Sequence, residues 1–237
     1  MDQIAPEFTV GITGHRWNKI PNSEGARIAE QLASVFSIIN VAVQDTLTAH
    51  HVAQPPSLRL VSGLAEGADQ MAVWSRPKGW ALDAILPFPR ARYLNDFAPA
   101  PATFGVDRRQ EFKAALAQAR LIVECPETGN VVCGYKRVGE WLLSESNLLV
   151  AVWDGEKAAG PGGTAIVVLQ AIAQGLPVVW ICSRQDRVPT LISDISEADH
   201  RSDAETSNAG FIAKVIQSMV GSLVVASPSE FAELRKS

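Results

Sequence analysis

The stretch Phe8-Thr9-Val10-Gly11-Ile12-Thr13-Gly14-His15-Arg16 joins an apolar run to a glycine turn and two basic side chains. The same order of apolar run and glycine-rich turn returns at residues 58–69 and again at 148–164. Each pattern is typical of a buried strand whose following loop exposes backbone N–H groups beside a helix N-terminus, where an anion is stabilised. Because the loops after parallel strands share one edge of a sheet, we expect these three loops to meet at one ligand-binding crevice.

The rest of the chain alternates between strand-like and helix-like patterns. Strands are predicted at 7–13, 58–62, 80–86, 121–124, 147–153 and 176–181. Helices are predicted near 23–50, 66–76, 107–119, 134–146, 164–174 and 211–224, with Ser23 as the N-cap of the first and Gly175 at the C-terminal cap of the fifth. This alternation predicts an α/β fold, a Rossmann-like, doubly wound, mostly parallel sheet with helices on both faces. The most apolar strand, 147–153, is expected in the middle of that sheet.

Two stretches lack both periodicities. Residues 90–105 contain two prolines and a glycine and are expected to be irregular. Residues 184–208 are polar and are expected to form a loop or a partly disordered segment.

Composition restricts the class of protein. With 237 residues and 47% hydrophobic side chains, the chain is long enough for one large domain. Its net charge of −4 disfavours a polynucleotide partner, because phosphate neutralisation needs a basic excess. The three cysteines lack zinc spacing and suit a reducing cytoplasm, and neither a signal peptide nor an apolar run long enough to span a bilayer is seen. We therefore expect a soluble cytoplasmic protein with no membrane association, no bound metal and no resident cofactor.

The first loop offers Gly14 for a tight turn, with His15 and Arg16 facing an anionic ligand. An ordinary strand-to-loop turn with a solvated His and Arg explains the same residues equally well.

The second loop, residues 62–69, is small-sided and leaves its backbone accessible through Ser62, Gly63 and Gly67. Its carboxylates, Glu66 and Asp69, are placed to accept hydrogen bonds from ribose hydroxyls, as acidic residues do in nucleotide sites. The alternative is that they serve only the first turn of the following helix.

The third loop contains Gly162, Gly163 and Thr164, a group suited to binding a phosphate at a helix start. It lacks the lysine of an ATPase phosphate loop, and a mobile surface loop is the alternative. Asp154 ends the preceding strand and is placed at the same edge, either facing the ligand or capping the turn with Gly155.

Other polar residues leave the choice open. Arg90 and Arg92 follow the third strand, where they reach either a phosphate or solvent. Tyr135, Lys136 and Arg137 lie near a helix start, where a subunit contact or a solvated face is as plausible as a ligand contact.

As a set and in this order, the motifs resemble the SLOG superfamily, Rossmann-like domains related to the DNA-processing protein A family and the "lonely guy" phosphoribohydrolases. The resemblance covers about residues 7–183 and rests on the segments 11–16, 62–69, 86–89, 151–155 and 162–164 together with Tyr93 and Phe97. It implies that residues 1–183 form a nucleotide-binding core, with 184–237 adding a polar loop and a C-terminal helix that packs on the same domain. It also implies a ligand sensor of the kind proposed for bacterial defence systems.

The chain departs from the enzymatic branch of that superfamily at one position. The phosphoribohydrolase signature Pro-Gly-Gly-x-Gly-Thr-x-x-Glu ends in a catalytic glutamate, whereas here Thr164 is followed by Ala165, Ile166, Val167 and Val168. With no carboxylate in that turn, acid–base catalysis from it is excluded. Enzymatic cleavage then depends on Glu66 or Asp154, with Asp69 as a third candidate.

Three functions remain in order of preference. The first is binding of a nucleotide or nucleotide-derived small molecule (ADP-ribose-like, cyclic or mononucleotide), as a sensor. The second is cleavage of a nucleotide N-glycosidic bond, as in a phosphoribohydrolase, and the third, by analogy with the DNA-processing relatives, is single-stranded DNA binding. Apolar positions on the outer helices also predict a homodimer or a higher closed assembly.

Overall fold

A computed structural model describes residues 6–97, 107–127, 130–157, 163–193 and 209–225. Within these residues the chain forms a seven-stranded sheet in the order β4-β3-β2-β1-β5-β6-β7. The strands are β1 (Glu7–Gly14), β2 (Ser57–Ser62), β3 (Ala81–Leu86), β4 (Leu121–Glu124), β5 (Leu148–Trp153), β6 (Val178–Cys182) and β7 (Thr190–Ile192). All neighbouring strands pair in parallel except β6 and β7, which are antiparallel. The predicted Rossmann-like α/β fold is confirmed.

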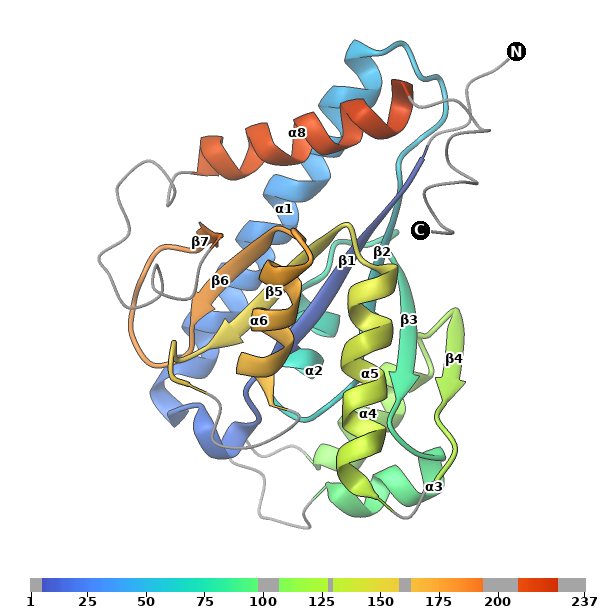
Figure 1. The fold of residues 1–237 in the computed structure, drawn as a ribbon, viewed down its shortest axis with the longest axis vertical. Helices are drawn as coiled ribbons and strands as arrows, with labels where there is room; N and C mark the ends of the chain where they lie inside the picture. The colour runs from blue at the N-terminus through green and yellow to red at the C-terminus, as the bar shows by residue number, and fades with distance from the viewer. Residues whose placement is uncertain (1–5, 98–106, 128–129, 158–162, 194–208, 226–237) are drawn as a thin grey trace.

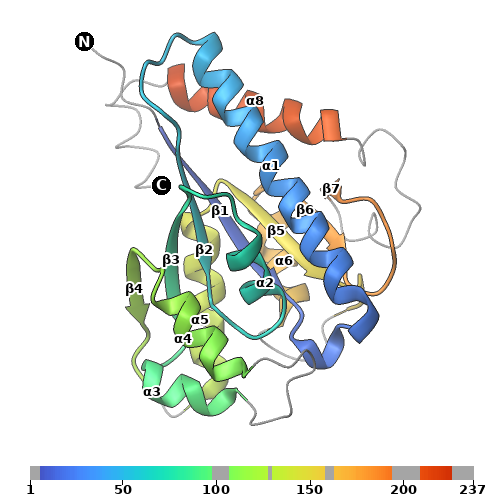
Figure 2. The ribbon, with the colours of Figure 1, turned by 180° about the vertical axis from the view of Figure 1, so that it is seen from behind.

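Helices cover both faces of the sheet (Figures 1 and 2). On one face α5 (Val131–Glu145) packs over β1, β2 and β3, and α6 (Thr164–Ala173) packs over β1, β5 and β6. The other face carries α1 (Gly25–Ala49), α2 (Ala68–Ser75) and α4 (Arg108–Leu116). The C-terminal helix α8 (Ala209–Val225) lies across α1 and buries Ile212, Ile216 and Val220 against the same core.

The order of the strands fixes one special position in the sheet. From β1 the chain winds outward through β2, β3 and β4, and it then returns to place β5 on the other side of β1. The two halves therefore diverge at the boundary between β1 and β5, the position where open α/β sheets hold their ligands. All six residues of β5 are buried, which agrees with its predicted interior place in the sheet.

The long helix α1 is a core helix. By length and composition the helical stretch Asn22–Ala49 would also pass for a membrane span. In this fold Ile28, Leu32, Val35, Phe36 and Ile39 are completely buried against the sheet and its neighbouring helices.

Three local predictions need correction or limits. Ser23 is not an N-cap, because a 3-10 turn (Asn22–Glu24) precedes α1 and the Ser23 hydroxyl bonds to Glu24 instead. Part of 90–105 is helical, since α3 (Arg90–Tyr93) and a 3-10 turn η3 (Leu94–Asp96) pack Tyr93 into the core. The polar stretch after residue 183 contains β7, whose Thr190 and Ile192 are buried against β6. The remainder of both stretches, 98–106 and 194–208, lies outside the described residues.

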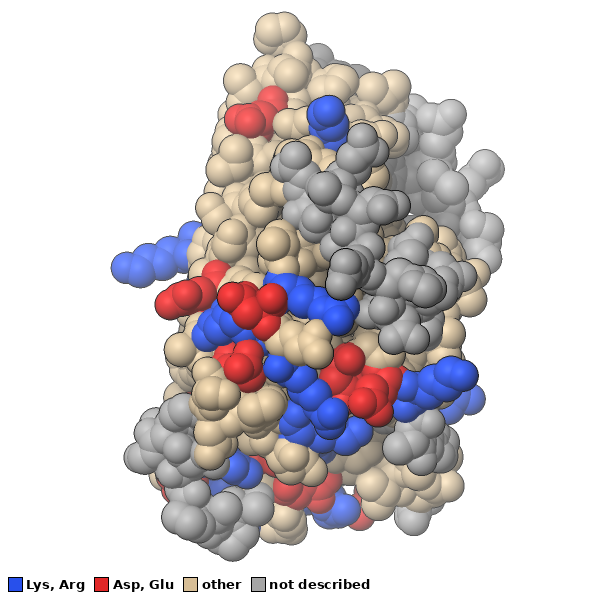
Figure 3. Space-filling model, turned by 90° about the vertical axis from the view of Figure 1, so that its left-hand side faces the viewer, with Lys and Arg blue, Asp and Glu red and all other residues tan. Residues whose placement is uncertain are grey.

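Charge is distributed without a single dominant sign on the face seen in Figure 3. Lysine and arginine side chains lie intermixed with aspartate and glutamate side chains across the middle of this face. No continuous basic area is visible there among the described residues.

Candidate functional site

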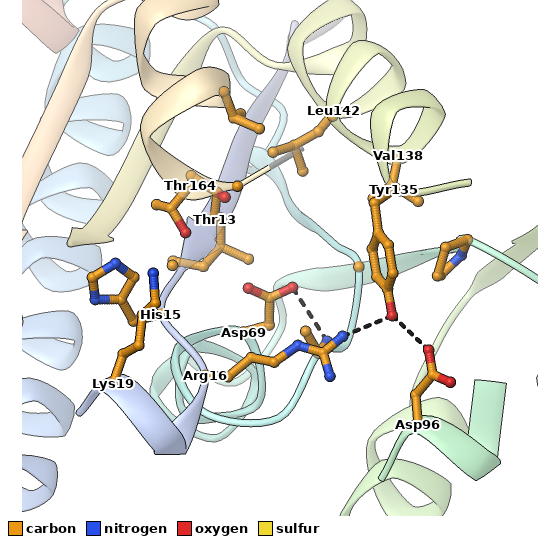
Figure 4. Close-up of a pocket in the computed structure, with 18 of the residues that line it drawn as sticks. Thr13, His15, Arg16, Lys19, Asp69, Asp96, Tyr135, Val138, Leu142 and Thr164 are labelled. Atoms are coloured by element: carbon orange, nitrogen blue, oxygen red, sulfur yellow. Dashed lines mark hydrogen bonds between the residues drawn. The ribbon is translucent and has the colours of Figure 1, made fainter. Parts of the chain in front are cut away.

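A cavity of about 530 Å³ lies where the carboxyl ends of β1 and β2 meet the N-terminal halves of α5 and α6. This volume is within the range of small-molecule sites. Figure 4 shows its polar lining, which includes Arg16, Lys19, Asp69, Asp96, Tyr135 and Thr164. One stripe of α5, with Val131, Val138 and Leu142, forms an apolar wall.

Backbone hydrogen bonds join the first glycine loop to β5 and to the second glycine loop at the base of the cavity. The backbone N–H of His15 donates to Val152 O at 2.9 Å, and that of Ala68 donates to His15 O at 3.0 Å. Gly67 has a φ of +94°, and a Cβ there would lie 2.6 Å from His15 O. Only glycine fits this contact, so the close approach of the loops after β1 and β2 depends on it.

Arg16 is the guanidinium that reaches the cavity, and it is held by α5. Its Nη2 donates to the Tyr135 hydroxyl at 2.8 Å, and its Cζ lies 5.4 Å from the centroid of that ring. The Tyr135 hydroxyl in turn donates to Asp96 Oδ2 at 2.7 Å. Burial and the bond to Asp96 raise the pKa of Tyr135 to about 12, so the phenol keeps its proton at neutral pH. Burial opposes the ionisation of Asp96, but hydrogen bonds from Tyr135 and Arg92 hold its pKa below the usual value.

Asp69 is the carboxyl group of the second loop that faces the cavity. Its side chain is on the first turn of α2, and its Oδ2 accepts the Ala65 N–H at 3.3 Å and the Ser62 hydroxyl at 3.5 Å. Burial raises the pKa of Asp69 to about 7, although the Ala65 hydrogen bond and the Arg16 charge oppose this. A carboxyl group that titrates near neutrality both accepts hydrogen bonds and donates a proton, which makes it a candidate for ligand recognition or acid–base chemistry.

The third loop brings the start of α6 to the same cavity. Gly163 is the N-cap of α6, and both Gly163 and Thr164 line the cavity. In Figure 4, Thr164, His15 and Lys19 lie on one side of Asp69 and Arg16, and Tyr135 lies on the other. The helix start and Lys19 make that side favourable for an anion.

His15 lines the cavity, but both of its ring nitrogens face protein groups. Nδ1 is 3.2 Å from Ser183 Oγ, and Nε2 is 3.6 Å from Asp154 Oδ1. Burial lowers the pKa of His15, against the raising effect of Asp154. Asp154 also pairs with Arg184 Nη2 at 3.4 Å and accepts the Glu156 N–H. Asp154 therefore orients His15 and its own turn and does not line the cavity.

Glu66 is occupied as well. Arg108 Nη1 lies 2.8 Å from Glu66 Oε2, and Glu66 does not line the cavity. Ser62 is fully buried and accepts the Leu64 N–H at 3.0 Å, which supports the loop from behind.

The predicted site residues thus divide into two groups. Those that line the cavity are Gly14, His15, Arg16, Gly63, Asp69, Gly163 and Thr164. Those that support it without lining it are Ser62, Glu66, Gly67 and Asp154, and Gly162 lies outside the described residues. Arg90 and Arg92, which follow β3 on α3, do not line the cavity. Arg90 pairs with Glu124, and Arg92 pairs with Asp96.

The polar lining residues Asn18, Lys19, Tyr93 and Asp96 were not singled out from the sequence as ligand contacts, and Tyr135 was left open between a ligand contact, a subunit contact and a solvated face. One signal was present for Tyr135, because Val131, Tyr135, Val138 and Leu142 recur at helical spacing and share one face of α5. Asp96 lies on η3, in a segment without periodicity, and no sequence pattern marks it.

Among the described residues, no group of three or more His, Cys, Asp or Glu side chains is placed to hold a metal ion. No protein-family model matches the chain, and comparison with curated proteins found no match.

Proposed function

We propose that the cavity binds a nucleotide or a nucleotide-derived small molecule. The observation that carries this proposal is the meeting of Arg16, Asp69 and the start of α6 in one cavity beside the switch point between β1 and β5. Guanidinium and helix-start N–H groups suit phosphate oxygens. A carboxyl group suits a ribose hydroxyl, and the wall of α5 suits a base.

A sensor is the preferred form of this function. The first turn of α6 holds no carboxylate, and Glu66 and Asp154 are engaged by Arg108 and by His15 and Arg184. The two carboxylates first considered for catalysis are therefore paired with protein groups and do not line the cavity. The resemblance to the SLOG superfamily supports an ADP-ribose-like, cyclic or mononucleotide signal, bacterial defence as the setting, and a cytoplasmic location.

A nucleotide N-glycosidase, or phosphoribohydrolase, is the second candidate, and one observation favours it. Asp69 is a buried carboxyl group in the cavity with a pKa of about 7. In that role Asp69 would donate its proton to the leaving base while the bond from the base to ribose C1′ breaks, water would add its oxygen to C1′, and the proton that the water loses would restore the Asp69 carboxyl group. Single-stranded DNA binding is disfavoured by the intermixed charge in Figure 3 and by the net charge of −4.

We also propose that the protein forms a homodimer or a higher closed assembly through α5 and α6. The helix α6 carries no charged side chain, although it lies at the surface with Leu169 45% exposed. The helix α5 lies beside α6 on the same face of the sheet, and its Trp141 is 39% exposed. A helix that is apolar on all sides is usually covered, and a second copy would cover it.

A thermal-shift screen followed by chromatography tests the ligand proposal. The purified protein is heated with mononucleotides, NAD, ADP-ribose and cyclic nucleotides, since a bound ligand raises Tm with its concentration relative to Kd. A ligand that stabilises the fold and is recovered intact supports the sensor. A ligand that is consumed with release of free base supports the glycosidase, and an absence of any shift at millimolar concentration refutes both.

A further inference from the structure

Arg16 is a long side chain that must be held in one direction to recognise a phosphate group. An unrestrained arginine loses considerable rotamer entropy on binding, and this weakens the complex. Here the guanidinium is held in two ways, by a hydrogen bond to the Tyr135 hydroxyl and by a contact with the face of the Tyr135 ring.

Tyr135 is itself fixed, and the direction of its proton is determined. A phenol has one proton to donate, and Tyr135 gives it to Asp96 at 2.7 Å. The oxygen lone pairs are therefore left for Arg16 Nη2, which lies on its other side in Figure 4. The ring is held edge-on by Phe88 and Tyr93, with centroids 5.6 and 6.4 Å away.

Asp96 anchors the far end of this chain of contacts. Its other oxygen pairs with Arg92, whose guanidinium lies 4.9 Å from the centroid of the Phe88 ring. Burial works against a charge on Asp96, yet its two hydrogen-bond donors keep it ionised and able to accept the phenol proton. The contacts Arg16–Tyr135–Asp96 thus have one consistent set of donors and acceptors.

We propose that Tyr135 and Asp96 are positioning residues that orient the Arg16 guanidinium and thereby set the affinity of the cavity for the phosphate of its ligand. This inference rests on the proposed nucleotide-binding function. Binding then has two separate contributions. The apolar wall of α5 contacts the base, and Tyr135 and Asp96 strengthen phosphate binding by orienting Arg16.

The test uses Tyr135→Phe, which keeps the ring and removes only the hydroxyl. Isothermal titration with AMP and with adenosine as probes should show about a tenfold weaker Kd for AMP and less than a twofold change for adenosine. In an Arg16→Met background the same substitution should have no further effect on AMP, because the group that it orients is gone. Equal weakening of AMP and adenosine, or an additive loss in the double variant, would overturn the proposal.

A second measurement needs no ligand. The chain has only two tyrosines, and the pKa of Tyr93 is raised well above its ordinary value by burial, so the phenol that titrates near 12 is Tyr135. Asp96→Asn should lower that pKa, because it removes the anion that accepts the phenol proton. An unchanged pKa would refute the hydrogen bond from the Tyr135 hydroxyl to Asp96 on which the proposal depends. Wild-type protein that binds neither probe and none of the other screened nucleotides refutes the proposed function instead.

Discussion

The variant Asp69→Asn should become more stable relative to the wild type as the pH rises. The carboxyl group is buried beside Ser62 and Ala65, and its pKa in the folded protein is about 7. An aspartate in an unfolded chain has a pKa of about 3.9. Asparagine has nearly the same shape and no ionisation.

The sign follows from which state binds the proton more tightly. Because the folded-state pKa is raised, the folded protein retains the Asp69 proton that the unfolded chain has already lost. The stability that this bound proton gives the wild-type protein is fully present below about pH 4, declines from about pH 4 to pH 7, and is absent above that. A difference of about 3 pKa units corresponds to about 4 kcal/mol. The stability of Asp69→Asn relative to wild type should therefore increase by about 4 kcal/mol between pH 4 and pH 8.

Urea denaturation at a series of pH values measures this difference directly. Glu30→Gln, at an exposed position on α1, is the matched control and should follow the wild type at every pH. A gap between Asp69→Asn and wild type that does not change with pH would show that Asp69 has an ordinary pKa. That result would remove the physical basis for its acid–base role in the cavity.

Three further pairs of substitutions test other parts of the structure. Gly67→Ala should lower the free energy of unfolding by about 3 kcal/mol in urea denaturation, because the new Cβ adds a clash with His15 O to backbone strain. The control is Gly79→Ala, which has a similar φ of +98° and nothing within 4 Å of the new Cβ, and it should lower the free energy of unfolding by less. Asp83→Ala should lower the free energy of unfolding by about 3 kcal/mol in the same assay, because it leaves the buried Arg59 without its partner at 2.8 Å. Arg120 also pairs with Asp83, but its side chain is 51% exposed, so Arg120→Gln should lower the free energy of unfolding by less than about 1 kcal/mol. Trp141→Glu combined with Leu169→Lys should convert an oligomer to a monomer in light scattering; a wild-type monomer would contradict the proposed α5–α6 interface.

The strands and most helices were predictable because buried parallel strands require continuous apolar runs. Residues 147–153 are the clearest case, and β5 was found there with every residue buried. The meeting of the three glycine loops was predictable for a related reason, since parallel strands bring their following loops to one edge. Arg16, Asp69 and Thr164 line one cavity as a consequence.

The parts that were missed depend on tertiary contacts. The strand β7 is three residues long and forms because the edge of β6 offers it a partner, which a local pattern cannot reveal. The roles of Glu66 and Asp154 were decided by Arg108 and by His15 and Arg184, residues distant in the sequence. Tyr135 and Asp96 gain their significance only from each other and from Arg16.

Recognition of a phosphate group by Arg16 in this cavity is tested most directly by one titration. The best nucleotide from the screen is titrated into wild type, Arg16→Met and Arg90→Met, the last being the same change at an arginine outside the cavity. We predict that Arg90→Met binds like wild type and that Arg16→Met binds at least tenfold more weakly. Equal affinity for all three proteins would contradict the account.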